Sequence, residues 1–254
     1  MVLFAHRAHA EFPLIVAANR DEFHARPAQK LQWWVESPDI LAGRDLQGGG
    51  TWLGLHRNGR FATITNYRDA EPPHTRRVTR GKLVTDFLSG NDDPMQYLSG
   101  IDGDRFAGFN LIVADGANLA YLSNRGGGCA ALEPGVYGLA NSTLDSSWPK
   151  VERCKAALNA LIAADQVNET TLLRLLDDRR MASAAELETD GASFERAHAM
   201  SAPFIVLPDY GTRCSTVLTR SADGQFRIAE KRFAADGTST GQTNFSFSLG
   251  NQPA

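Results

Sequence analysis

The sequence predicts an α+β fold in which two antiparallel sheets are stacked on each other. Short apolar runs separated by turns fill the first 70 residues, helical patterns occupy the middle of the chain, and strand-like runs return near its end. Strands that are segregated from helices in this way favour antiparallel pairing. Because the runs outnumber the strands of one sheet of ordinary size, two stacked sheets are plausible.

The N-terminal region is predicted to form hairpins. The polar segment "RAHAE" separates two apolar runs, which is the spacing of two strands joined by a longer loop. Further along, "RNG" separates two apolar runs that follow a glycine-rich turn, and this pattern predicts a second hairpin. The strands expected here are 1–6, 12–19, 31–36, 40–45 and two runs within 46–68.

The rest of the chain alternates between helical and strand patterns. Apolar residues recur at helical spacing in 81–90, 147–165 and 168–180, with Pro149 near one start and Asn168 as a candidate N-cap. Asp115 and Gly116 supply the strongest hairpin turn in the chain. The strands expected here are a hairpin within 106–124, then 134–142, 202–221, 226–234 and 245–249.

Composition is that of an ordinary soluble globular protein. The chain has 254 residues, 43% of them hydrophobic and 22% charged, with a formal net charge of −3. Such a charge gives no attraction to nucleic acid or anionic membranes, and no run approaches the ~18 apolar residues of a membrane span. The first residues lack the layout of a signal peptide. We therefore expect one cytoplasmic domain over 1–254, with no nucleic-acid binding and no membrane insertion.

Several conspicuous residues have ordinary structural explanations. Gly48 to Gly50 precede a strand rather than a helix, so a tight turn is favoured over a phosphate-binding loop. His6 and His9 would point to opposite faces of a strand, which favours an exposed hairpin over a metal site. No metal site is expected. Core packing is also the favoured role of the cysteines and of the tryptophans, namely Cys129, Cys154, Cys214, Trp33, Trp34 and Trp52.

Four clusters of polar residues lie at the ends of predicted strands. They contain Asn19 to Glu22, then Asn66 with Arg68, then Asn141, and finally Arg213. Each alone is more often a turn residue, but strand ends are rigid places from which to present functional groups. Asn side chains are neutral donors suited to a developing oxyanion. A turn and a functional site are about equally favoured by this pattern.

The motifs "AANRDEF", "AGRDLQGGGTWLGL", "NGRFATITNYR", "RGKLV", "GFNL", "LANSTLD" and "YGTRCSTV" resemble those of the NRDE family, also called the transport and Golgi organization protein family. The resemblance runs from the first strand to about Val217. It implies an N-terminal-nucleophile hydrolase-like fold, which is a four-layer αββα sandwich. In the cysteine branch of that superfamily, an N-terminal Cys attacks an amide carbonyl and its own α-amine serves as the base.

The resemblance also implies roles for individual residues. Asp21 would hold the α-amine, and Asn19 would support the same corner. Asn141 would donate to the oxyanion, with Asn66 as a second donor. Arg213 resembles an Arg at a strand start near the nucleophile.

The start of the chain departs from the family pattern. Family members begin Met-Cys, whereas this chain begins Met1-Val2 and has no nucleophile in its first five positions. Met1 falls where the family places an apolar residue just after its Cys, so we expect the native chain to begin Met-Cys-Met-Val-Leu. The alternative is a member that has lost the nucleophile.

Two functions follow from the resemblance. Without a Cys, the expected role is binding of a small apolar or amphipathic ligand, such as haem or a lipid or acyl-CoA, with no cofactor required. His6 or His9 could then be an axial haem ligand, although no motif supports this. The expected ligand-binding residues are Arg20, Glu22, Trp52, Arg44 and Arg68. With the Cys restored, hydrolysis of a linear amide C–N bond is favoured. The oligomeric state is not predicted.

Overall fold

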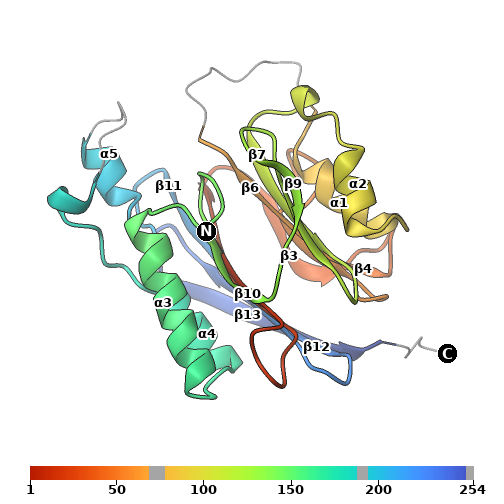
Figure 1. Ribbon diagram of the computed structural model, residues 1–254. Coiled ribbons are helices and arrows are strands. Elements are labelled where there is room, and N and C mark those ends of the chain that lie inside the picture. The colour runs from red at the N-terminus through yellow and green to blue at the C-terminus, as the bar shows by residue number, and fades with distance from the viewer. Residues whose placement is uncertain (69–77, 188–193, 250–254) are drawn as a thin grey trace.

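The computed structural model describes residues 1–68, 78–187 and 194–249 and contains two antiparallel sheets packed face to face (Figure 1). The first, sheet A, has six strands in the order β10-β1-β2-β11-β12-β13. Their bounds are β1 Val2–His6, β2 Leu14–Phe23, β10 Gly135–Leu139, β11 Tyr210–Arg220, β12 Gln225–Phe233 and β13 Ser239–Ser248. The N-terminal strand therefore lies inside the sheet, between β10 and β2.

The second, sheet B, has seven strands that follow the chain order from β3 to β9. Their bounds are β3 Ala28–Trp33, β4 Ile40–Asp45, β5 Leu53–His56, β6 Phe61–Asn66, β7 Phe109–Ala114, β8 Leu119–Ser123 and β9 Gly128–Ala131. Every neighbouring pair is antiparallel, including β6 and β7, whose connection contains α1 and α2.

Helices cover the outer faces of both sheets. Helices α1 (Gly81–Ser89) and α2 (Pro94–Ser99) pack on sheet B, and α3 (Pro149–Ala163) and α4 (Glu169–Leu176) pack on sheet A (Figure 1). The remaining elements are α5 Phe194–Ala199 and the 3₁₀ turns Gly103–Arg105 and Ala184–Glu186. The predicted α+β class and the four-layer αββα sandwich are confirmed. None of the described helices has the length and apolar character needed to cross a membrane.

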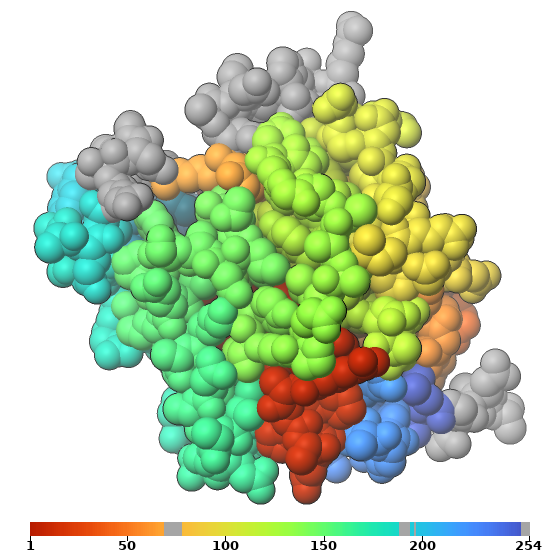
Figure 2. All heavy atoms as spheres, in the orientation of Figure 1, coloured from red at the N-terminus to blue at the C-terminus, as the bar shows by residue number. Residues whose placement is uncertain are grey.

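Three apolar cores separate the four layers, and β1 contributes to two of them. Val2 and Phe4 belong to the core between the sheets, whereas Leu3 and Ala5 belong to the core beneath α3 and α4. This alternation is the period of two that a strand imposes on its side chains. Both faces are buried, so the strand appears in the sequence as a continuous apolar run. In Figure 2 the loop that follows β1 emerges in red at the surface, while Met1 is only 6% exposed.

The structure differs from several predicted elements. The strand expected at 31–36 is β3 at 28–33, and Val35 is 94% exposed beyond its end. His6 is buried rather than exposed on a hairpin. The strand expected at 245–249 is the second half of β13, whose first half, 239–244, is polar. The short elements α2, α5 and β9 were not predicted, because each has too few apolar residues to show a period.

Gly50 allows sheet B and the start of α1 to approach closely. A Cβ at this position would lie 2.4 Å from the carbonyl carbon of Gly81 and 2.6 Å from its oxygen. We therefore expect Gly50→Ala to lower the free energy of unfolding by about 1–3 kcal/mol, measured by urea denaturation. Gly49→Ala meets no atom within 4 Å and is strained only by its φ of +77°, so we expect a smaller loss of about 1 kcal/mol. An equal loss in both variants would contradict a steric role for Gly50.

Candidate active site

The α-amine at the start of β1 is buried beside the end of β2. Met1 N donates a 3.0 Å hydrogen bond to Asn19 O, and Asn19 N donates a 2.9 Å bond to Met1 O. Asp21 Oδ2 lies 3.8 Å from the amine, at ion-pair distance. The strand pairing therefore brings the amine to the first acidic side chain of the "NRDE" segment.

Asp21 is fixed by a hydrogen bond from β11, and the donor of that bond is held by the loop before the strand. Thr212 Oγ1 donates to Asp21 Oδ1 at 2.7 Å, and Ile205 N donates to Thr212 Oγ1 at 2.9 Å. The Asp21 side chain is 9% exposed. One carboxylate oxygen is thus occupied by Thr212, which leaves the other facing the amine.

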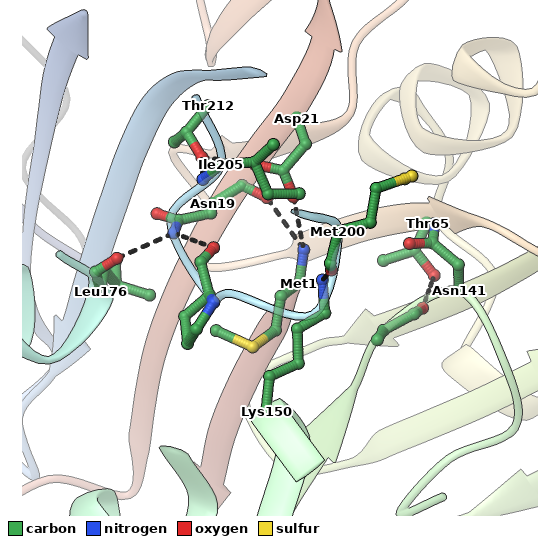
Figure 3. Close-up of polar contacts among 12 residues, drawn as sticks. Met1, Asn19, Asp21, Thr65, Asn141, Lys150, Leu176, Met200, Ile205 and Thr212 are labelled. Atoms are coloured by element: carbon green, nitrogen blue, oxygen red, sulfur yellow. Dashed lines mark hydrogen bonds and ion pairs between the residues drawn. The ribbon is translucent and has the colours of Figure 1, made fainter. Parts of the chain in front are cut away.

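Asn19 ties β2 to the helical layer behind the sheet. Its Nδ2 donates to Leu176 O and to Pro203 O, both at 2.9 Å, and its Oδ1 accepts from Ser215 Oγ at 2.6 Å. In Figure 3 a dashed line joins the Asn19 amide to Leu176. The side chain is therefore a structural support of the corner that holds the amine.

Lys150, in the first turn of α3, is a buried cation beside this corner. It is 3% exposed, and its Nζ donates to Met200 O at 2.8 Å and to Ala202 O at 3.5 Å. Figure 3 shows the side chain rising from α3 toward Met1. Within the described residues no carboxylate lies at ion-pair distance from it, so carbonyl dipoles alone satisfy the ammonium.

Burial and charge act together on the α-amine. Burial lowers the pKa of the Met1 amine from its usual 8.0, the Asp21 carboxylate opposes this change, and the Lys150 charge lowers the pKa further. Burial likewise lowers the pKa of Lys150, against the attraction of Asp21. Burial and the nearby Lys150 charge therefore both disfavour the charged form of the amine, and Asp21 opposes them.

A cavity of about 300 Å³ opens next to the amine, between the sheets and the start of α1. Trp52 and Arg20 lie on its wall, with the guanidinium carbon 4.2 Å from the indole centroid. A second guanidinium, that of Arg26, is bonded to Asp45 Oδ2 at 2.7 Å. Most of the lining is polar. It includes Asn19, Asp21, Glu22, Thr51, Thr63, Thr65, Asn66, Thr79, Arg80, Asn141 and Tyr210.

Sequence comparison relates the chain to a known family. The model of the family described as Transport and Golgi organisation 2 matches residues 1–235. The chain belongs to this family. The Bos taurus protein "Transport and Golgi organization protein 2 homolog" is 36% identical over 242 residues, which cover 87% of this chain and 86% of that protein. The Homo sapiens homologue is 34% identical over 239 residues, with the same coverage. The Drosophila melanogaster relative is 24% identical over 243 residues.

Among solved structures, a variant of conjugated bile acid hydrolase from Clostridium perfringens has the same fold. The TM-score is 0.50, and the match covers 98% of each chain at 8% sequence identity. At that identity the likeness is one of fold alone. It places this Transport and Golgi organisation 2 family member among proteins with the N-terminal-nucleophile hydrolase-like sandwich.

The residues expected to form a site divide into two groups in this family member. Those that line the cavity are Asn19, Arg20, Asp21, Glu22, Trp52, Asn66 and Asn141. Asn141 Nδ2 donates to Asn66 O at 2.9 Å, which joins the ends of β10 and β6. The cavity therefore gathers strand ends that lie far apart in sequence, from Asn19 on β2 to Tyr210 at the start of β11.

Three other expected site residues do not line the cavity. Arg44 pairs with Glu36 and lies 4.6 Å from the centroid of the Trp34 ring. Arg213 Nη1 donates to the carbonyls of Phe23 and His24, each at 3.0 Å, and so braces the end of β2. Arg68 follows β6, and its backbone N donates to Asn141 O at 2.7 Å. Neither His6 nor His9 lines the cavity.

Lys150 and Thr212 were not among the expected site residues. Thr212 lies in the "YGTRCSTV" motif, in which Arg213 is the only charged residue and Thr212 is an ordinary strand residue. Lys150 follows Trp148 and Pro149 at a helix start, where a lysine is ordinarily solvated. No pattern in the sequence indicates that the loop at 200–205 covers it.

Proposed function

We propose that the cavity hydrolyses a linear amide C–N bond in a chain that carries a Cys immediately before Met1. The observation that supports this is the register of β1 against β2. Met1 opposes Asn19, so a preceding residue would oppose Arg20. Opposed residues of an antiparallel pair share a face.

The two faces of β2 have different surroundings. Alternate residues up to Ala18 belong to the core between the sheets, and Arg20 continues that face against Trp52. Met1 belongs to the other face, in the core beneath the helices. A Cys before Met1 would therefore direct its thiol into the cavity, and its α-amine would lie towards Asp21, the next residue along β2.

The chemistry follows from that placement. The thiol proton passes to the neutral α-amine, and the sulfur attacks the amide carbonyl carbon. The C–N bond then breaks, the departing amine takes the proton, and water hydrolyses the remaining thioester. Asp21 orients the α-amine, and Asn141 or Asn66, which both line the cavity, donates to the oxyanion. Lys150 favours the neutral amine that the first step needs.

The test compares chains that begin Met-Cys-Met1 and Met-Ala-Met1, assayed with a panel of N-acyl 4-nitroanilides. We expect turnover from the Cys chain only. In that chain, Asp21→Asn should lower kcat/KM by about a hundred-fold or more, because the base loses its orienting carboxylate. Equal rates from the Cys and Ala chains would overturn the proposal.

A second candidate function, binding of an amphipathic anion, is supported by the Arg20–Trp52 pair. A guanidinium over an indole offers a charged partner and an apolar face to one ligand. At about 300 Å³ the cavity is at the small end of ligand sites, so it fits the carboxylate or phosphate end of a larger molecule such as haem or an acyl-CoA. No cofactor is required for either function.

This candidate has a matched control. Arg57 lies 3.8 Å from the centroid of Trp33, and neither residue lines the cavity. We expect Arg20→Ala to weaken binding of haemin or palmitoyl-CoA about ten-fold or more, measured by tryptophan fluorescence, and Arg57→Ala to leave it unchanged. Equal effects of the two variants would argue against binding in the cavity.

A further inference from the structure

We propose that β13 is a dimerisation edge, on which a second copy of this chain adds its own β13 in antiparallel orientation. Strand β13 is the outermost strand of sheet A and spans ten residues, Ser239–Ser248. A free edge of this length presents a row of unpaired backbone groups, which is a template for another strand.

The other three sheet edges carry protective features. In β13 the register shift and the one glycine with positive φ, Gly241, lie near its start, and the pairing with β12 is regular from Gly241 to the end of the strand. At β10, Asp145 closes the edge, since Gly138 N donates to Asp145 Oδ1 and Asp145 N donates to Gly138 O, both at 2.8 Å. At β3, Glu230 Oε1 accepts from Leu31 N at 2.9 Å, next to a register shift. Strand β9 has four residues and begins at a glycine with positive φ.

Strand β13 contains no charged residue and no proline in "STGQTNFSFS". Natural edges are usually blunted by one of these. The neutrality also bears on the identity of the partner. A strand that pairs with itself about a two-fold axis brings its own charges together, and β13 has none to repel.

The register shows which backbone groups face outward. Leu249 N donates to Gly224 O at 3.2 Å, so this pair is hydrogen bonded. Bonded and non-bonded pairs alternate along an antiparallel ladder. Residues 241, 243, 245 and 247 therefore direct their backbone groups to β12, and residues 242, 244, 246 and 248 direct theirs to the free edge. In the described part of the chain, no other strand pairs with this side of β13.

The side chains along β13 suit the same partner. Phe245 and Phe247 continue the core between the sheets, with Trp33 at 6.2 Å and 5.4 Å between ring centroids, and both remain partly exposed. Pairing about a two-fold axis would set these rings beside the same residues of the second copy. Cross-strand aromatic pairs stabilise a sheet.

Ser246 provides the test, because its side chain is exposed and its N–H faces outward. Sedimentation velocity of the full chain over a wide range of concentration should reveal a species of twice the 27.6 kDa chain mass. We expect Ser246→Pro to remove that species and Ser246→Ala to retain it. Far-UV circular dichroism and the melting temperature should stay close to those of the wild type in both.

A charge swap identifies the second copy as the partner. We expect Ser246→Lys and Ser246→Glu each to be monomeric alone and to form a dimer when mixed. A wild type that stays monomeric at every concentration would overturn the proposal, because β13 would then not pair with a second copy of the chain. A dimer that persists in Ser246→Pro, or a mixture that stays monomeric, would overturn it as well.

Discussion

Replacing Asn19 with Ala should destabilise the fold by about 3–5 kcal/mol, the largest effect we expect from a change in this corner. The amide satisfies the buried carbonyls of Leu176 and Pro203 and accepts from Ser215. Alanine leaves two acceptors and one hydroxyl without a partner where water does not reach. For a chain of this size, the melting temperature should fall by roughly 10 °C.

Asn66→Ala is the matched control. Asn66 is an Asn at a strand end that also lines the cavity, yet it is exposed, and its side chain has no hydrogen bond among the described contacts. We expect its free energy of unfolding to stay within about 0.5 kcal/mol of the wild type in urea denaturation. Equal losses in the two variants would contradict the bracing role of Asn19.

Lys150→Met should flatten the pH dependence of stability. Burial lowers the pKa of Lys150 and of the Met1 amine in the folded chain below the ordinary values of 10.5 and 8.0 that the unfolded chain retains. Below those ordinary values, the unfolded chain binds protons that the folded chain resists. The contribution to stability is therefore complete above pH 10.5, and it falls as the pH drops towards each folded pKa.

We accordingly expect the free energy of unfolding of the wild type to rise with pH from neutral to alkaline conditions. In Lys150→Met the Lys150 contribution to this rise is absent. The carbonyls of Met200 and Ala202 lose their donor in this variant, which shifts the whole curve without tilting it. Urea denaturation at a series of pH values measures both the offset and the slope.

Lys155→Met provides a control on the same helix. Lys155 is 31% exposed, and its Nζ lies 2.7 Å from Asp145 Oδ2. Its removal should leave the alkaline slope as it is in the wild type. If the free energy of unfolding rose equally steeply with pH in Lys150→Met and in the wild type, the pKa of Lys150 would not be lowered by burial.

Much of the cavity could be predicted from the sequence, because many of the residues that line it are polar residues at the ends of strands. Asn19, Asp21, Asn66 and Asn141 each follow an apolar run. The ends of β2 and β10 lie at the same edge of sheet A because both strands run antiparallel to β1, which lies between them. Residue type alone could not show which way a strand-end cation points. Arg44 lies against Trp34, and Arg213 donates to backbone carbonyls. Both are arginines near strand ends, as Arg20 is, but only Arg20 lines the cavity.

Two features depended on contacts that no local pattern records. Lys150 is buried because residues 200–205 fold over the start of α3, about fifty positions later in the chain. The sequence pattern predicts only the aromatic half of β13, because its polar half shows no alternation of apolar residues. In both cases tertiary packing determines the structure of a segment whose polar composition predicts exposure to solvent.

The position of β1 inside sheet A has a consequence for the life of the nascent chain. Strand β1 pairs with β2 and with β10, which begins at Gly135, and β2 pairs in turn with β11, which begins at Tyr210. Synthesis proceeds from the N-terminus, so these later strands do not exist during most of translation. The pairing that buries the start of β1 is therefore completed only after β10 and β11 have been synthesised.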